Sequence, residues 1–225
     1  MKKVITFFQV ICAGTLLFFQ AGNLQAQDTL IDESFETGIP GSWSQQYVRG
    51  TWDWEDETHG GGIMGNYKPP SAIAGSRLAR FYYQNDNGET TKLITPQLDL
   101  GTASYAELHF YHYMRQWGYN QDELRVYYRV HEDSSWVMLE EYITNVSSWT
   151  KRTIHLPEIS STYYIAFEGK TGWGYGACID GVVVKSVAPT PKSVDTIIVT
   201  QASSDIIPRN TTDNPVLRMK FEIEG

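Results

Sequence analysis

A regular series of short segments between residues 77 and 184 constrains the fold of this chain most strongly. In the clearest of them, 106–114 and 123–130, apolar side chains recur at every second position, which is the period of a strand with one buried face. Few segments follow a helical period, and the connections are too short for parallel crossovers. The pattern predicts an all-β, antiparallel β-sandwich with strands at 77–83, 92–95, 106–114, 123–130, 136–142, 150–156, 163–168 and 179–184.

The flanking segments are less regular. A first strand is expected at 28–35, and the segment 43–62 predicts long loops around isolated aromatic side chains. Two prolines within 188–194 indicate an extended linker. The remainder, 195–225, holds two strand-like runs, which are too few for an independent core. We interpret it as the truncated start of a second β domain.

The first 26 residues are typical of a signal peptide. Lys2 and Lys3 precede an apolar run over 4–19, and Ala26 supplies a small residue at the expected cleavage point. A retained anchor is the alternative, but the run is shorter than the roughly 18 apolar residues of a spanning helix. The mature chain is expected to begin near residue 27 without a transmembrane helix. Only Cys178 would then remain, so no internal disulfide is expected.

Composition narrows the class of function. The net charge is -8 at pH 7, which gives no support to nucleic-acid binding, because that depends on basic patches. An acidic chain is compatible with divalent cations. Aromatic residues make up 13% of the chain and charged residues 20%, and the charged share lies below the usual quarter or so. These values favour a β-rich extracellular domain over a cytosolic helical enzyme.

Several short motifs follow one another along residues 30–187. They are Glu33-Ser34-Phe35-Glu36 with Gly38, Pro40 and Trp43; Leu93-Ile94-Thr95-Pro96 with Leu98; Leu108-His109-Phe110-Tyr111 with Tyr113; Ser148-Trp149; and Tyr164-Ile165-Ala166-Phe167 leading to Cys178-Ile179-Asp180-Gly181-Val182. Their joint order and spacing resemble those of the MAM-like, cleaved-adhesin domains of secreted Bacteroidetes proteins, which include gingipain adhesin regions and the related choice-of-anchor domains. The resembling domain spans 27–187.

This resemblance implies a jelly-roll β-sandwich that is secreted or displayed on the outer surface of a Gram-negative bacterium. It also implies an adhesive or carbohydrate-binding role, with a host glycan or an extracellular protein as the partner. The tail over 195–225 resembles, more weakly, the β segment that precedes sialidase-like BNR propellers. The two functional hypotheses are therefore a surface binding module and a non-catalytic accessory or anchoring domain of a larger enzyme.

The resemblance further implies structural calcium, for which oxygen ligands are suited. Carried over residue by residue, the ligands are Ser34 through its carbonyl, Glu36, Asp180 and the backbone oxygen of Thr91. The family often has a second acidic residue where this chain has Gly181. The acidic segment 53–59 corresponds to a second metal site of the family. A simpler reading remains open, in which the Asp180 carboxylate accepts turn N–H groups beside Gly181.

The aromatic residues Trp117, Tyr119, Trp173 and Tyr175 are the candidate ligand-binding residues. They lie in glycine-containing segments, where side chains often face solvent, and exposed rings stack on sugars or bind proteins. The alternative is that they pack over the ends of the sandwich. Neighbouring Asp122 could contact a ligand or serve as an ordinary turn residue.

An enzymatic role is not expected from the sequence. A pair such as Glu123 and Glu168 could be chosen as glycosidase carboxylates, but the sequence does not give their separation. His109 and His112 are three residues apart on one strand, so they point to opposite faces and cannot readily share a metal. Cys178 is expected to be a small buried apolar side chain.

Overall fold

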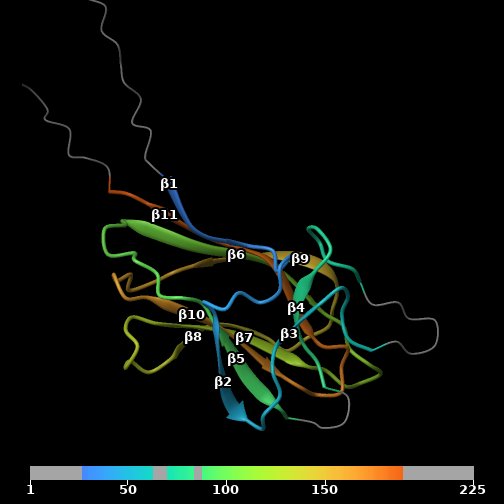
Figure 1. The fold of residues 1–225 in the computed structure, drawn as a ribbon. Coiled ribbons are helices and arrows are strands. Elements are labelled where there is room, and N and C mark those ends of the chain that lie inside the picture. Colours follow the sequence, from blue (N-terminus) through green and yellow to red (C-terminus); the bar gives the residue numbers. More distant parts are fainter. Residues whose placement is uncertain (1–26, 63–69, 84–87, 190–225) are drawn as a thin grey trace, which may run out of the picture. The chain divides into compact units, whose positions relative to one another are not determined.

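The computed structural model describes residues 27–62, 70–83 and 88–189, which form two antiparallel sheets packed face to face (Figure 1). The first sheet has the order β3-β4-β11-β6-β9, with β1 also paired to β11, and the second has the order β2-β5-β10-β7-β8. The strands are β1 (Gln27–Glu33), β2 (Ser44–Arg49), β3 (Glu55–Glu57), β4 (Leu78–Phe81), β5 (Thr90–Ile94), β6 (Tyr105–Met114), β7 (Glu123–Arg129), β8 (Val137–Tyr142), β9 (Val146–His155), β10 (Tyr164–Lys170) and β11 (Ala177–Val187).

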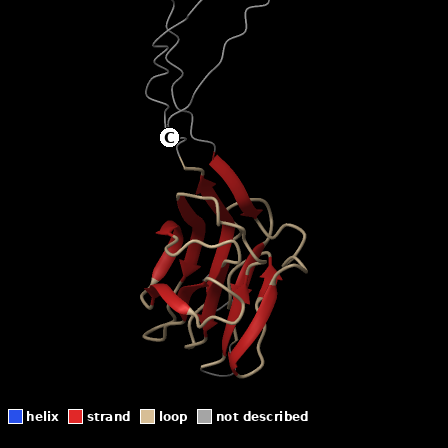
Figure 2. Ribbon diagram, turned by 90° about the vertical axis from the view of Figure 1, so that its left-hand side faces the viewer, coloured by secondary structure: helices blue, strands red, loops and turns tan. Residues whose placement is uncertain are grey.

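The predicted fold class is confirmed. Figure 2 shows strands and loops throughout the described part of the chain, and within that part no helix is long and apolar enough to cross a membrane. In β7, burial alternates residue by residue, so that Leu124, Val126 and Tyr128 face the core while Arg125 and Tyr127 face outward. This is the pattern expected of a strand with one buried face.

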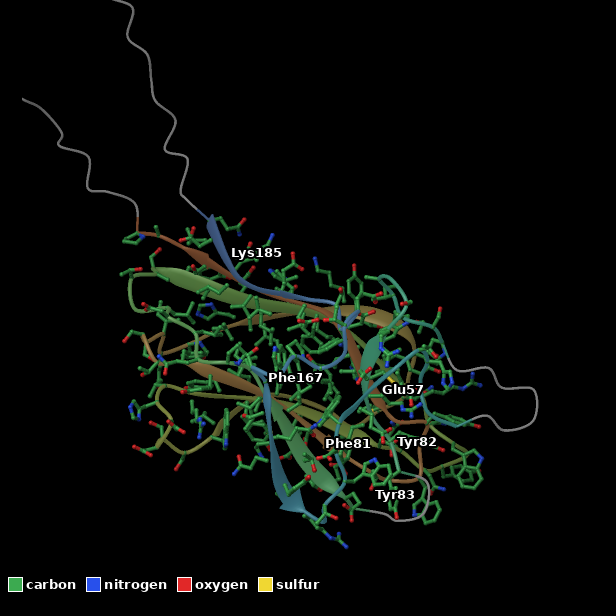
Figure 3. All side chains as sticks on the ribbon, viewed as in Figure 1. Glu57, Phe81, Tyr82, Tyr83, Phe167 and Lys185 are labelled. Carbon is green, nitrogen blue, oxygen red and sulfur yellow. The ribbon has the colours of Figure 1, made fainter. Side chains whose placement is uncertain are left out.

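Large aromatic side chains fill the space between the sheets. The ring of Phe167 on β10 lies 6.5 Å from that of Trp43 and 5.1 Å from that of Phe110 on β6. Phe81 on β4 lies against Gly169 of the opposite sheet, where an added Cβ would come within 2.5 Å of the Phe81 ring (Figure 3). A glycine at 169 is therefore required for this close packing.

One part of the secondary-structure prediction is wrong. Residues 43–57 were expected to form only loops, but they contain β2 and β3. All six residues of β2 are exposed, and β3 carries three acidic residues. Both are edge strands, and their polar sequences lack the apolar alternation from which strands are predicted.

The two ends of the described domain lie together. Gln27 at the start of β1 pairs with Val187 at the end of β11. The other end of β11 follows the turn 171–176, and eleven residues of strand span about 33 Å. That turn therefore lies at the opposite end of the sandwich (Figure 1). The expected signal peptide and second β domain lie outside the described residues.

Candidate functional site

Two turns lie side by side at one end of the sandwich. Residues 115–122 connect β6 to β7, and residues 171–176 connect β10 to β11. The backbone N–H of Tyr175 donates to the carbonyl of Arg115 over 2.9 Å. Within the first turn, Trp117 and Asn120 exchange backbone hydrogen bonds of 2.9 and 2.8 Å. The two turns form one surface, which we call the aromatic end.

Asp122 organises the aromatic end from below. Its side chain is 3% exposed, and its carboxylate accepts the backbone N–H groups of Gly172, Gly174 and Gly176 over 2.6, 3.1 and 2.7 Å. Burial raises the pKa of Asp122, while these three donors act in the opposite direction. A Cβ at position 174 would lie 2.3 Å from the carboxylate, so the turn can close around it only with glycine there. Asp122 therefore stabilises the turn, and its buried carboxylate does not reach the surface where a ligand would bind.

Trp173 adopts a rare backbone conformation in this turn. Its φ is 65°, in the left-handed region that larger residues seldom occupy. Trp173 remains 37% exposed, and Trp117 and Tyr119 on the neighbouring turn are 41% and 105% exposed. Strained backbone that is held in place by surrounding structure is common at binding sites. Three of the four candidate aromatic residues thus reach the surface together.

Tyr175, the fourth candidate, differs from the other three because it is buried. It is only 8% exposed. Its carbonyl accepts the N–H of Gly61 over 2.8 Å, and its ring lies against Gly62, where an added Cβ would be 2.7 Å away. The glycine N–H groups of this turn point towards Asp122. Of the two aromatic residues between the glycines, Trp173 is exposed, whereas Tyr175 is covered by residues 61–62.

A second site of interest surrounds Asp180 on β11. Its side chain is completely buried, and its carboxylate accepts the N–H groups of Ile73, Ala74 and Gly181 over 2.9, 3.2 and 2.7 Å. The contact with Gly181 is the one expected from the simpler reading of the sequence. The contacts with Ile73 and Ala74 show in addition that Asp180 holds a loop about 100 residues away in sequence.

Glu36 holds the other half of the same loop. Its carboxylate accepts the N–H groups of Ser76 and Arg77, each over 2.8 Å, and the Ser76 hydroxyl over 2.9 Å. The N–H of Arg77 is the largest of several causes that lower the pKa of Glu36. An added Cβ on Gly75 would lie 2.3 Å from the Glu36 carboxyl carbon. The 73–77 loop therefore rests on two carboxylates from opposite ends of the domain sequence.

These two carboxylates are close enough for their charges to interact. Burial is the main cause that raises the pKa of Asp180, and the charge of Glu36 raises it further. Among the described residues Asp180 forms no ion pair, although an unpaired buried carboxylate is costly. Ser34 lies two residues before Glu36, immediately after β1. The two carboxylates are oxygen donors of the kind that calcium prefers.

The sequence and fold both match known proteins. The sequence profile of the family described as MAM domain, meprin/A5/mu, matches residues 34–187. The chain belongs to the MAM family. No curated protein sequence matches the chain significantly.

Solved structures with the fold of this MAM domain include adhesins and carbohydrate-binding modules. The K3 cleaved adhesin domain of Lys-gingipain from Porphyromonas gingivalis has a TM-score of 0.55 at 20% identity, covering 72% of this chain and 99% of that domain. The carbohydrate-binding module TmCBM61, solved with β-1,4-galactotriose, has a TM-score of 0.50 at 14% identity, covering 70% and 97%. The CBM22-1 xylan-binding domain from Paenibacillus barcinonensis also has a TM-score of 0.50, at 13% identity, covering 73% and 98%.

Thr91 does not join the two carboxylates of the MAM domain. It lies on β5 of the second sheet, where its carbonyl accepts the Trp54 indole N–H over 2.9 Å and its hydroxyl donates to the Trp52 carbonyl over 2.6 Å. Asp180 lies on the first sheet and faces the 73–77 loop. The assignment of Thr91 as a ligand stays a prediction, and its carbonyl already accepts the Trp54 indole N–H.

The acidic segment 53–59 of the MAM domain places three of its carboxylates in ion pairs. Glu55 and Glu57 both pair with Arg80, at 3.3 and 3.2 Å, and Asp56 pairs with Arg77. Among the described residues no three His, Cys, Asp or Glu side chains gather in a way that could hold a metal. The carboxylates of this segment fasten β3 to β4 instead.

The carboxylates considered for catalysis are paired with cations. Glu123 pairs with Arg125 and with Lys170, the latter at 2.8 Å, and Glu168 pairs with Lys92. Burial raises the pKa of the Cys178 thiol to about 12, so it is not a reactive nucleophile at neutral pH.

Proposed function

We propose that this chain is a secreted binding module that recognises a glycan through its aromatic end. The observation that carries the proposal is Trp173, which is held at a φ of 65° and 37% exposed above the buried Asp122 carboxylate. A side chain whose backbone is already held in one conformation loses less conformational freedom on binding. Trp117 and Tyr119 extend the same surface, and flat exposed rings suit stacking against sugar faces.

The position of the aromatic end supports the same function. It lies opposite the end at which Gln27 and Val187 pair, so it stays accessible when the chain continues at either terminus. Two structural relatives are a module solved with a galactotriose and a xylan-binding domain. The same placement also suits the second candidate, an accessory domain that positions a larger enzyme, because such a domain would present this surface in the same way.

The proposal is tested by glycan-array screening of the purified chain, followed by calorimetry with the saccharide that binds. Replacing Trp117 and Trp173 together with alanine is expected to weaken binding by about 30-fold or more, as for a central aromatic contact. Tyr105→Ala is the matched control, because Tyr105 is 40% exposed and pairs with Val187 at the other end. Equal affinity of the double variant and the control would contradict the proposal.

We also propose that one calcium ion links Glu36 and Asp180 and stabilises the 73–77 loop. Calcium at about 100 times its dissociation constant would add nearly 3 kcal/mol to the stability of the folded state. For a domain of this size that corresponds to a rise of roughly 5–10 °C in the unfolding midpoint. Differential scanning calorimetry with calcium and with a chelator measures this shift.

Asp180→Asn provides the matching variant for the calcium experiment. It keeps a side chain that can accept the loop N–H groups but removes the charge, so the calcium-dependent shift should disappear. Glu57→Gln is the control, since Glu57 pairs with Arg80 and lies outside the proposed site. A wild-type midpoint that does not respond to the chelator would contradict the calcium proposal and leave the glycan proposal unaffected.

A further inference from the structure

The side chain of Trp136 reaches across the outer face of the second sheet. β2 and β8 are its two edge strands, which in a flat sheet would be about 19 Å apart. Nevertheless the indole N–H of Trp136, the residue before β8, donates to the side-chain oxygen of Gln46 on β2 over 3.1 Å. For this contact the Trp136 side chain has to lie over the outer face of the sheet.

Side chains on this face are unusually well buried for a surface that no further layer of the described residues covers. Lys92 and Glu168 form an ion pair with exposures of 8% and 7%, and Lys92 lies 4.6 Å from the centre of the Tyr127 ring. Arg125 bonds Glu141 over 2.7 Å and lies 3.6 Å from Glu168. Each of these carboxylates is thus paired with a cationic side chain.

Arg129 is the exception on this face. Its guanidinium lies between two aromatic rings, 4.5 Å from the centre of Trp136 and 4.7 Å from that of Tyr164. Its one hydrogen bond among the described residues runs from Nη1 to the carbonyl of Glu132 over 2.6 Å. It forms no ion pair with a described residue, and its buried Nε lacks an acceptor there. An arginine whose guanidinium is held between two rings and is not paired with a carboxylate is well placed to bind the carboxylate of a ligand.

We propose that Arg129, Trp136 and Tyr164 form a second binding site, which takes a saccharide bearing a carboxylate. The guanidinium would pair with the carboxylate, and the two rings and the Gln46 amide would contact the sugar ring. A uronic acid and a sialic acid both present a carboxylate on a pyranose, so both fit this chemistry. The inference extends the proposed function to the kind of sugar, but it uses a surface separate from the aromatic end.

Calorimetry of the full chain with four probes tests this site. The acidic probes are an oligogalacturonate and sialyllactose, which distinguish the two sources of carboxylate, and the neutral probes are a galacto-oligosaccharide and lactose. We expect at least one acidic probe to bind more tightly than its neutral counterpart. Arg129→Gln should weaken that binding by about 10-fold or more, as expected for a charged hydrogen bond, and should leave neutral probes unchanged.

Two further variants make the result decisive. Lys151→Gln is the control, since it removes one positive charge from β9 of the other sheet. Arg129→Lys keeps the positive charge but loses the planar guanidinium. Its affinity for the acidic probe should lie between those of wild type and Arg129→Gln, and it can be measured even if Arg129→Gln folds poorly. Equal binding of acidic and neutral probes, or acidic binding that is unchanged in both Arg129 variants, would overturn the inference. If the Trp117 and Trp173 double variant alone loses binding, the inference fails while the proposed function stands.

Discussion

Replacing Asp122 with alanine is expected to lower the unfolding midpoint by roughly 10 °C and to abolish binding at the aromatic end. The substitution removes the common acceptor of three glycine N–H groups. Each buried donor left without a partner costs about 1–3 kcal/mol, and each kcal/mol corresponds to about 2–4 °C in a domain of this size. Without the carboxylate, the turn would lose three of the hydrogen bonds that hold Trp173 in its left-handed conformation.

The Asp122 prediction is measured by thermal unfolding together with glycan binding. Asp133→Ala is the control, since the Asp133 side chain is 94% exposed and its removal should change neither property. Asp122→Asn should have an intermediate effect, because its amide oxygen can still accept some of the N–H groups. An Asp122→Ala variant with wild-type stability and binding would show that the turn does not depend on this carboxylate.

His112 should make the domain sensitive to acid. It is completely buried, its ring lies 4.9 Å from that of Tyr142, and neither ring nitrogen has a hydrogen-bond partner among the described residues. Burial, helped by the charge of Arg152, lowers the pKa of His112 from 6.5 to about 3. Below pH 6.5 the unfolded chain therefore binds a proton that the folded chain excludes.

The direction in which His112 changes the stability of the domain follows from this difference in proton binding. Its contribution to stability is complete above pH 6.5 and is lost as the pH falls towards about 3, by up to about 1.4 kcal/mol for each pH unit. Urea unfolding of wild type and His112→Leu at pH 7 and pH 4.5 measures it. The leucine variant should lose less stability on acidification, whereas His131→Gln, a change at an exposed side chain, should behave as wild type. Parallel losses in wild type and His112→Leu would contradict the prediction.

The sequence was sufficient to predict the sandwich because its central strands have one apolar face. Burial alternates residue by residue along β7 and along the first eight residues of β6, and that period is visible without coordinates. β2 and β3 were missed because edge strands need no apolar face. Their pairing is decided by the neighbouring strands β5 and β4, which the local sequence does not reveal.

The candidate sites were predicted in part. The aromatic end followed from glycine and aromatic residues in two segments, but the burial of Tyr175 depends on residues 61–62, more than 100 positions away. Asp122 was not distinguished from an ordinary turn residue, although three glycines at alternate positions in 172–176 are the signal of a turn closing around a buried acceptor. Arg129 was missed because its two rings come from β10 and from the residue before β8.

The most direct test of the glycan-binding function is an NMR titration that follows the tryptophan indole N–H signals as the saccharide found on the array is added. The structure predicts that the signals of Trp117 and Trp173 shift until the site is saturated. The signal of Trp54 should stay fixed, because its indole is buried and donates to the Thr91 carbonyl. Saturation of the domain by the saccharide without any shift of the Trp117 and Trp173 signals would contradict the assignment of the aromatic end as the binding site.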